Sequence, residues 1–500
     1  MMSQTESEVF SADQDGASNG SIVSFLLSLS IKTSICLFLA LLTVERFFPN
    51  TAINVFGLIS LSIYIYFSTI RKSAYLGFVF LIFVLAHFNY ASNQGGIVNF
   101  AALLVLLAAL ITGKYQAKKD PLLLAAVGLM LMFNFAGYFF NPIAPFTDVA
   151  KGAAAFVAYI LVFVFCSSLR FRLNNMGSII AVLSFISFYS MVMALNYFLS
   201  VYVINTPIPF LTPSPERFGS STIANMTGNS ELYGEESLMF LAFCLPLLFA
   251  PKHVKSAYKV NMLIIIIVIM TSLAGLYLSR SRSVIILMIF MILIMPLLQN
   301  IAGLSAGAIL RNTIITLVVL IGTSLVLWAV INIGYSFERF DNIDFFQLTT
   351  EGVISGEQIN RGVLFEYGFN RLKSEPWFFG FGWLTYRYNM QCAVGPFSVF
   401  ESIDLHSLYL TLPFLFGWIG SAAFLSIFFI TLRRLWNIMR KAEMALNSWR
   451  VVALCFFLAI LFFLLNEYKI GILREPHYFM TIWIWLGLSN SLCRSYKEAQ

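Results

Sequence analysis

The sequence predicts an all-α polytopic membrane protein. Hydrophobic residues make up 59% of its 500 residues and charged residues only 11%. The mean hydropathy of +0.82 lies far above that of soluble globular domains. The apolar runs are about 20 residues long, which is what a helix needs to cross about 30 Å of hydrocarbon, whereas barrel strands alternate over about ten residues. The membrane spans are therefore expected to be helices.

Hydropathy predicts about fourteen spans. Residues 1–22 precede them as an acidic, Ser-rich stretch without Lys or Arg, which we expect to be a disordered tail rather than a signal peptide. Residues 493–500 form a second short tail. The expected spans are residues 23–43, 51–70, 74–88, 97–112, 121–140, 150–167, 177–200, 236–250, 261–279, 283–298, 312–333, 405–430, 450–467 and 477–492.

The charges of the short loops give the expected orientation. Every second loop carries Lys or Arg, as in the loop with Lys114, Lys118 and Lys119, whereas the loops between them carry almost none. By the positive-inside rule the basic loops and both chain ends are cytoplasmic. The last basic stretch, residues 431–450, is amphipathic and is expected to lie among the headgroups of the inner leaflet.

Two loops on the predicted outer side are longer than a simple connection requires, at residues 203–235 and 334–404. Loops of this length within a compact protein are usually functional. Pro, Ser, Asn and Gly preclude a regular helix over most of the first loop. In the second, the apolar spacing of residues 355–373 predicts a short amphipathic helix on the outer membrane surface, which Pro376 ends.

Cysteine usage gives no sign of a metal or disulfide site. Five of the six Cys lie in or beside apolar runs, and only Cys392 lies in a long loop. A buried free Cys behaves as a small hydrophobic residue. The outer loops also contain no Asp-x-Asp motif and no Cys/His ligand set, so we expect neither a metal nor another cofactor.

Positive charges on the outer side require an explanation because topology selects against them. Arg280 and Arg282 lie in a Ser-rich turn where one span ends and the next begins. Free N–H groups at a helix start, together with guanidinium groups, suit a phosphate or pyrophosphate. The alternative is that both Arg cap the preceding helix and reach into the headgroups.

Other ionisable residues converge on the same predicted surface. Arg361 could pair with Glu357 on a helix, and Arg371 could face lipid phosphates. His406 stands where the second long loop returns to the membrane, and a lone His at such an edge is often structural. Two carboxylates precede it, Glu401 and Asp404. The convergence of these residues in an otherwise almost uncharged chain favours chemistry at this surface.

The order of these motifs resembles the bacterial O-antigen polymerase and O-antigen ligase superfamily. The resemblance covers residues 210–430. It rests on Arg217 with Gly219 and Asn225, Ser281 with Arg282, then Arg361, Pro376, Gly380 and Gly382, and His406 followed by Gly417 and Gly420. An Arg-x10-Gly pattern in both long loops, Arg217 with Gly228 and Arg371 with Gly382, is similar to the polymerase branch. Ligase-like members usually have Asn after the His, where Ser407 stands here.

The resemblance implies an all-helical fold of the GT-C type in the bacterial inner membrane, with the active site on the periplasmic side. It implies a glycan on undecaprenyl pyrophosphate as donor, a second lipid-linked repeat unit as acceptor, and no nucleotide sugar or metal. The implied partners are these lipid-linked glycans, membrane lipid and a chain-length regulator protein, but not nucleic acid.

The resemblance also assigns roles to single residues. His406, Arg282 and Arg361 would be catalytic, with His406 as the base that deprotonates the attacking hydroxyl. The residues expected to bind pyrophosphate or substrate are Arg217, Arg280, Arg371 and Gly382. Glu401 and Asp404 are the reserve candidates for the base.

Two other functions remain open at the level of sequence. A ligase would use the same donor but transfer the glycan to lipid A core. A transporter of lipid-linked oligosaccharides would typically have ionisable residues and broken helices near the membrane midplane, and internal repeats. The sequence shows neither such ionisable residues and broken helices nor internal repeats, apart from Lys32 in the first apolar run.

Overall fold

The computed structural model describes most of the chain beyond residue 119. All of the residues it describes belong to one of the two compact units into which the chain divides, made of residues 80–102 and 116–500. The described ranges are 120–141, 145–198, 230–250, 252–258, 260–279, 281–301, 351–354, 357–360, 368–373, 378–383, 407–441, 447–467 and 476–500, with single positions between 307 and 322.

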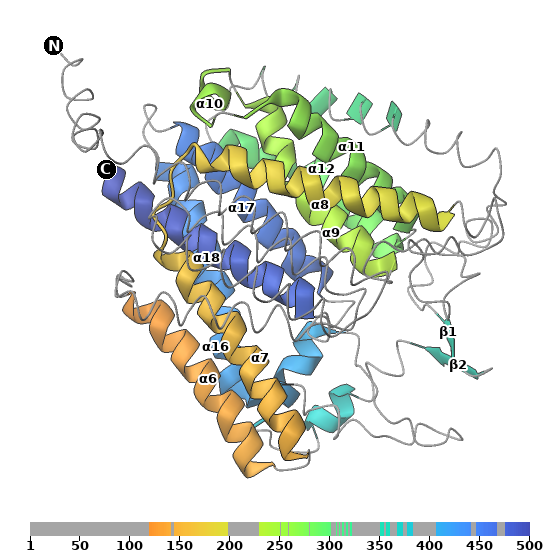
Figure 1. The fold of residues 1–500 in the computed structure, drawn as a ribbon, viewed down its shortest axis with the longest axis vertical. Coiled ribbons are helices and arrows are strands. Elements are labelled where there is room, and N and C mark those ends of the chain that lie inside the picture. The colour runs from red at the N-terminus through yellow and green to blue at the C-terminus, as the bar shows by residue number, and fades with distance from the viewer. Residues whose placement is uncertain are drawn as a thin grey trace, which may run out of the picture. The chain divides into compact units, whose positions relative to one another are not determined.

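The described part of the chain is helical apart from one short hairpin (Figure 1). The helices are α6 (Pro121–Phe140), α7 (Phe146–Ser168), α8 (Asn175–Phe198), α9 (Ser230–Phe249), α10 (Lys252–Ala257), α11 (Met262–Ser279), α12 (Arg282–Ile301), α16 (Leu408–Lys441), α17 (Asn447–Asn466) and α18 (Pro476–Ala499). The hairpin pairs β1 (Glu351–Ile354) antiparallel with β2 (Glu357–Asn360).

Seven of the described helices are long and apolar enough to cross a membrane, namely α6, α7, α8, α9, α11, α16 and α17. A shorter apolar stretch, Ser283–Gln299, lies within α12. The prediction of a polytopic helical membrane protein is thus confirmed. The four spans predicted before residue 113 lie outside the described residues, as does most of the span predicted at 312–333.

Helix α9 is the most enclosed of the seven candidate spans. Of its apolar window, 94% is buried, and it packs against α8, α11, α12 and α17. Phe243, near its middle, contacts Phe456 of α17 and Trp485 of α18 at centroid distances of 5.1 and 4.6 Å. A helix that is apolar on every side belongs at the centre of a bundle, and this is where α9 lies.

The pairs α6 with α16 and α7 with α18 continue the packing. Helix α6 buries one face, which includes Met130 and Phe133, and exposes the other. Phe139 is 86% exposed and Leu122 is 60% exposed. A stripe of large exposed apolar side chains is unfavourable in water, but lipid tails solvate it without cost.

Three helices extend beyond the spans predicted from hydropathy. Helix α9 begins at Ser230, so the last residues of the loop predicted at 203–235 are helical. Helix α16 continues to Lys441, so about half of the basic stretch at 431–450 is a continuation of the span helix. Helix α18 likewise runs through the predicted tail to Ala499. Hydropathy marks where apolar residues stop, whereas good helix formers carry the backbone hydrogen bonds further.

The amphipathic helix predicted over residues 355–373 was only partly correct. Glu357–Asn360 form β2, and a helical turn appears at 368–373. Ser355 and Gly356 separate β1 from β2, and a two-residue Ser-Gly connection favours a hairpin over a helix. The helical pair predicted between Glu357 and Arg361 therefore does not apply, because Glu357 lies in a strand.

Candidate functional site

The Gly-x-Gly motif, Gly380 to Gly382, lies buried between helices α6 and α16. We call residues 378–383 the glycine segment. The N–H of Phe381 donates to the carbonyl of Phe414 in α16 at 2.7 Å. The next N–H, of Gly382, donates to Leu415 at 2.9 Å. An extended backbone thus pairs with a helix, which requires helix carbonyls that are not bonded within the helix itself.

A break in α16 supplies these carbonyls. Gly417 has φ 68° and ψ 178°, far from helical values, in the middle of what is otherwise a continuous helix. Such a residue interrupts the ladder of N–H to C=O bonds that would use the carbonyls of Phe414 and Leu415. A positive φ favours glycine. Gly417 of the motif therefore has a structural role: it breaks α16 so that two helix carbonyls can bond to the glycine segment.

Helix α6 binds the other side of the segment through polar side chains. The N–H of Trp383 donates to the Asn134 side chain at 2.7 Å, and the Tyr138 hydroxyl donates to the Trp383 carbonyl at 2.8 Å. Asn141 donates to the Gly380 carbonyl at 2.9 Å. Buried backbone groups must find partners, and in this segment α6 and α16 provide them.

The glycines let these backbones approach closely. A Cβ on Gly137 of α6 would lie 2.7 Å from the Gly382 nitrogen, and one on Gly380 would lie 2.2 Å from the carbonyl carbon of Leu415. Gly382 has φ +84°, and a Cβ there would lie 2.2 Å from the ring of Tyr138. The structure thus gives Gly382 a packing role and engages its N–H. Its binding of substrate stays a prediction.

A polar cluster lies where α16 begins, directly after the predicted base His406. The N–H of Leu408 donates to the carbonyl of Glu467 at 3.0 Å, which joins the start of α16 to the end of α17. Ser407, Asn466 and Glu467 are each at most 2% exposed. We call these three residues the Asn466 cluster. They are polar side chains enclosed at one end of an apolar bundle.

Two members of this cluster have no hydrogen-bond partner for their side chains among the described residues. Within the part of the chain that the structure describes, no group is hydrogen-bonded to the Ser407 hydroxyl or to either polar atom of the Asn466 side chain. A buried polar group without a partner costs about 1–3 kcal/mol. An arrangement that costs stability in this way, beside a predicted catalytic residue, is typical of a functional site.

We call the connection from Ser279 to Ser283, between α11 and α12, the Ser-Arg turn. Its residues Ser279 and Ser281 lie against the first turns of α9. A Cβ on Gly234 would lie 2.5 Å from the Ser279 hydroxyl and 3.4 Å from the Ser281 side chain. Ser281 is buried, and its hydroxyl lies 3.2 Å from that of Ser283. Two carboxyl groups follow at once on α9, since Glu235 is 2% exposed and Glu236 is 3% exposed.

The Ser-Arg turn and the Asn466 cluster lie at the same end of the bundle. Phe290 of α12 contacts Phe462 of α17 at a centroid distance of 6.2 Å. Helix α12 begins eight residues before Phe290 and α17 ends four residues after Phe462. The two helices run in opposite directions, because Tyr258, which follows α9 and α10 in the chain, donates to Ser448 at the start of α17, whereas Gly234 near the start of α9 lies against Ser281, just before α12 begins. With a rise of about 1.5 Å per residue, the start of α12 and the end of α17 therefore lie on the same side of this contact, within about 12 Å of it along the helix axes.

The structure describes only some of the predicted site residues. Gly382 lies in the glycine segment, and Arg371 lies in the helical turn at 368–373 with its side chain partly exposed. Arg282 is the first residue of α12, at the N-terminal helix end that an anion site requires. The others lie outside the described residues, namely Arg217, Arg280, Arg361, Glu401, Asp404 and His406.

No protein-family model matches the chain, and no curated protein matches it. The function must therefore be inferred from the residues of the site. Within the described ranges, no group of three or more His, Cys, Asp or Glu side chains could hold a metal ion.

The predictions from sequence missed Glu235, Glu236, Asn466 and Glu467. Each lies at or next to the end of an apolar run, where hydropathy marks only the limit of a span. Carboxyl groups at membrane depth are costly and rare, so a charged residue at the edge of a span is itself a signal of function. That signal would have identified all three Glu.

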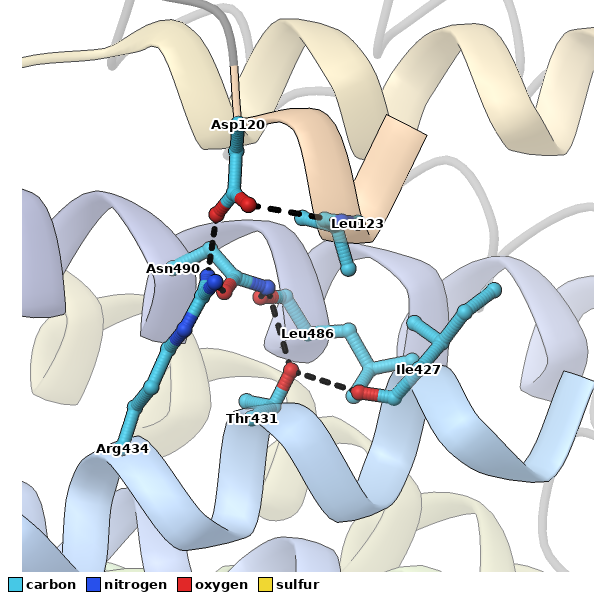
Figure 2. A network of polar contacts seen from close by, with 7 residues as sticks. All are labelled: Asp120, Leu123, Ile427, Thr431, Arg434, Leu486 and Asn490. Atoms are coloured by element: carbon cyan, nitrogen blue, oxygen red, sulfur yellow. Dashed lines mark hydrogen bonds and ion pairs between the residues drawn. The ribbon is translucent and has the colours of Figure 1, made fainter. Parts of the chain in front are cut away.

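The opposite end of the bundle holds a second polar network (Figure 2). Arg434 of α16 forms an ion pair with Asp120 at the start of α6 and donates to Asn490 of α18 at 3.2 Å. Asn490 in turn donates to Thr431 at 3.1 Å. Asp120 also accepts from the N–H of Leu123 at 3.3 Å and so caps α6. The network connects three helices.

Arg434 changes the acidity of Asp120. Burial by itself raises the pKa of this carboxyl group, but the hydrogen bond and positive charge of Arg434 outweigh that effect. The net pKa lies below the ordinary value of an Asp. The arrangement suits a structural ion pair, because it keeps Asp120 charged and bonded over the physiological pH range.

Proposed function

We propose that this protein is an O-antigen polymerase of the bacterial inner membrane. It would join oligosaccharide repeat units carried on undecaprenyl pyrophosphate, with undecaprenyl pyrophosphate as the leaving group, in a GT-C type fold of about fourteen spans. The active site would lie on the periplasmic side, with both chain ends in the cytoplasm. The order of motifs along the sequence supports this proposal.

The observation that carries the proposal is that the Ser-Arg turn and the Asn466 cluster lie at the same end of an apolar bundle. The first includes Arg282 at a helix start, and the second directly follows His406. A cationic group and a base are the two elements that transfer from a lipid pyrophosphate requires. Both would stand at the membrane surface, where a lipid-linked substrate presents its pyrophosphate.

In the proposed mechanism, His406 accepts the proton of an acceptor sugar hydroxyl while that oxygen attacks the anomeric carbon of the donor. The bond from this carbon to the pyrophosphate oxygen breaks, and the electron pair leaves with the pyrophosphate. Arg217, Arg280, Arg282, Arg361 and Arg371 are the candidates to stabilise the developing negative charge. Loss of one such contact commonly costs about 2.7–4 kcal/mol of transition-state stabilisation.

The glycine segment has a positioning role in this proposal. It follows Arg371 and Pro376 in the chain, and its backbone is bonded to both α6 and α16. A long loop fixed at this point has less conformational freedom, so its charged residues lose less entropy on binding. Stiffening of the loop would explain why a rigid, buried Gly-x-Gly belongs to a motif of a catalytic surface.

The direct test uses purified full-length protein with lipid-linked repeat units and no lipid A core. A polymerase yields a ladder of lengthened lipid-linked glycans, and His406→Ala, Arg217→Ala and Arg371→Ala each abolish it. A full ladder with His406→Ala would refute the assignment of the base. If no ladder forms and core becomes capped when it is added, the protein is the ligase instead.

A transporter of lipid-linked oligosaccharide is the second candidate, because α16 is broken and three buried Glu lie in or next to the ends of the spans. The details favour it less. Transporters leave the broken backbone open to the substrate, whereas the carbonyls of Phe414 and Leu415 are bonded to the glycine segment. Movement of intact lipid-linked repeats across proteoliposomes, without lengthening, would favour the transporter.

A further inference from the structure

The Asn466 cluster has hydrogen-bonding groups that no described residue uses. The Asn466 side chain offers an amide donor and a carbonyl acceptor, and the Ser407 hydroxyl can do either. Both side chains are only 2% exposed, and no described group bonds to any of these polar atoms. The unused groups are uncharged and include both hydrogen-bond donors and acceptors, in contrast to the cationic groups expected to bind the pyrophosphate.

The two residues are fixed in position relative to each other. Leu408, next to Ser407, donates its N–H to the carbonyl of Glu467, next to Asn466, at 3.0 Å. One residue further on, the Tyr409 hydroxyl donates to the carbonyl of Leu464 at 2.6 Å. These bonds hold the start of α16 against the end of α17. The unpartnered groups are therefore part of a rigid element, as a preorganised binding site requires.

We infer that Asn466 and Ser407 form a subsite that binds sugar hydroxyl groups of the lipid-linked glycan. An amide presents a donor beside an acceptor, which matches two neighbouring hydroxyl groups, each of which can donate and accept. A charged phosphate would not use the amide acceptor, and an alkyl chain would use neither group. The inference rests on the proposed function and deepens it, because it assigns recognition of the sugar to two residues of the Asn466 cluster, one of which directly follows His406 in the sequence.

The experiment compares two ligands on the full-length protein in lipid nanodiscs. One is undecaprenyl pyrophosphate, and the other is the same lipid carrying an oligosaccharide repeat unit. The variants are Asn466→Leu, which keeps the volume without the polar atoms, and Ser407→Ala. Thr411→Val is the matched control, because the Thr411 hydroxyl is also buried in α16 but already donates to the Ser407 carbonyl at 2.7 Å.

We expect wild type to bind the glycan-bearing lipid more tightly than the bare lipid. Asn466→Leu should weaken binding of the glycan-bearing lipid by about tenfold, the loss expected for one to two neutral hydrogen bonds, and leave the bare lipid unaffected. Ser407→Ala should act in the same direction, whereas Thr411→Val should retain the preference for the glycan. Without ligand, Asn466→Leu should melt at a higher temperature than wild type, because it removes unbonded polar atoms.

The failures are distinguishable. If wild type binds both lipids equally, or if both variants keep the preference for the glycan, the subsite is wrong while the proposed function stands. If Asn466→Leu melts below wild type without ligand, Asn466 has a structural partner and the inference fails. If wild type binds neither lipid, the proposed function fails, and the subsite with it.

Discussion

Substitution of two glycines in α6 should have opposite effects on stability. Gly128 and Gly137 lie in the same helix, and Ala in either position removes the conformational cost of a helical glycine, worth about 1 kcal/mol. A Cβ at Gly128 meets nothing within 4 Å. Gly128→Ala should therefore stabilise the protein by about 1 kcal/mol.

At Gly137 the same methyl group meets the backbone of the glycine segment. Its contacts would be 2.7 Å to the Gly382 nitrogen, 2.8 Å to the Gly380 oxygen and 3.0 Å to the carbonyl carbon of Phe381. Backbone cannot rotate away as a side chain can, so the segment must shift. Overpacking costs about 1–3 kcal/mol, and the strained hydrogen bonds to α6 cost about 1 kcal/mol each. We expect a net loss of about 2 kcal/mol after the gain in helix propensity.

The assay is thermal unfolding of the purified full-length variants in one detergent, followed by fluorescence-detected size exclusion. Gly128→Ala serves as the control for helix propensity and for expression level. Relative to wild type, Gly128→Ala should shift the melting temperature upward and Gly137→Ala downward. Equal stability of the two variants would show that the glycine segment is not in close backbone contact with α6 at Gly137.

Three further predictions concern charge and access. Asp120→Asn keeps the helix cap but loses the ion pair with Arg434, so its melting temperature should lie below that of wild type at neutral pH. Because the folded pKa of Asp120 is lowered, this difference should be complete above about pH 4 and disappear as the pH falls through the folded pKa. Arg282→Lys should lose most polymerisation activity, because Lys cannot form a two-pronged contact with pyrophosphate; full activity would favour simple charge neutralisation. An impermeant maleimide should label Cys392 in intact spheroplasts, since Cys166, Cys244, Cys455 and Cys493 are buried and Cys36 falls within the first predicted span. Labelling only after lysis would overturn the predicted orientation.

Much of the fold could be predicted from hydropathy. From residue 121 onward, every predicted span within the described ranges has a helix at its position, because about 20 apolar residues in lipid can satisfy their backbone only as a helix. The helix ends were less predictable. At Ser230 and Lys441 the helices continue into polar sequence, where helix propensity rather than hydropathy decides.

The site could be predicted only as a list of motifs. Gly380, Gly382 and Gly417 were recognised by their order, but their pairing across α6 and α16 depends on contacts between segments far apart in the chain. The ion pair of Asp120 with Arg434 was missed for the same reason, since 314 positions separate the two residues. Residue type and spacing carry no direct record of such contacts.

The glycine segment also constrains the order of biosynthesis. The hydrogen-bond partner of Tyr138, the carbonyl of Trp383, is synthesised 245 positions later in the chain. At about 5–20 residues per second, the ribosome needs about 12–50 s to deliver it. During this interval, Asn134 and Tyr138 of α6 stand in or beside the bilayer without their final partners, and α16 emerges later still. A nascent chain that stalls before residue 380 therefore exposes these two polar side chains on α6, which a membrane insertase or quality-control protease could recognise.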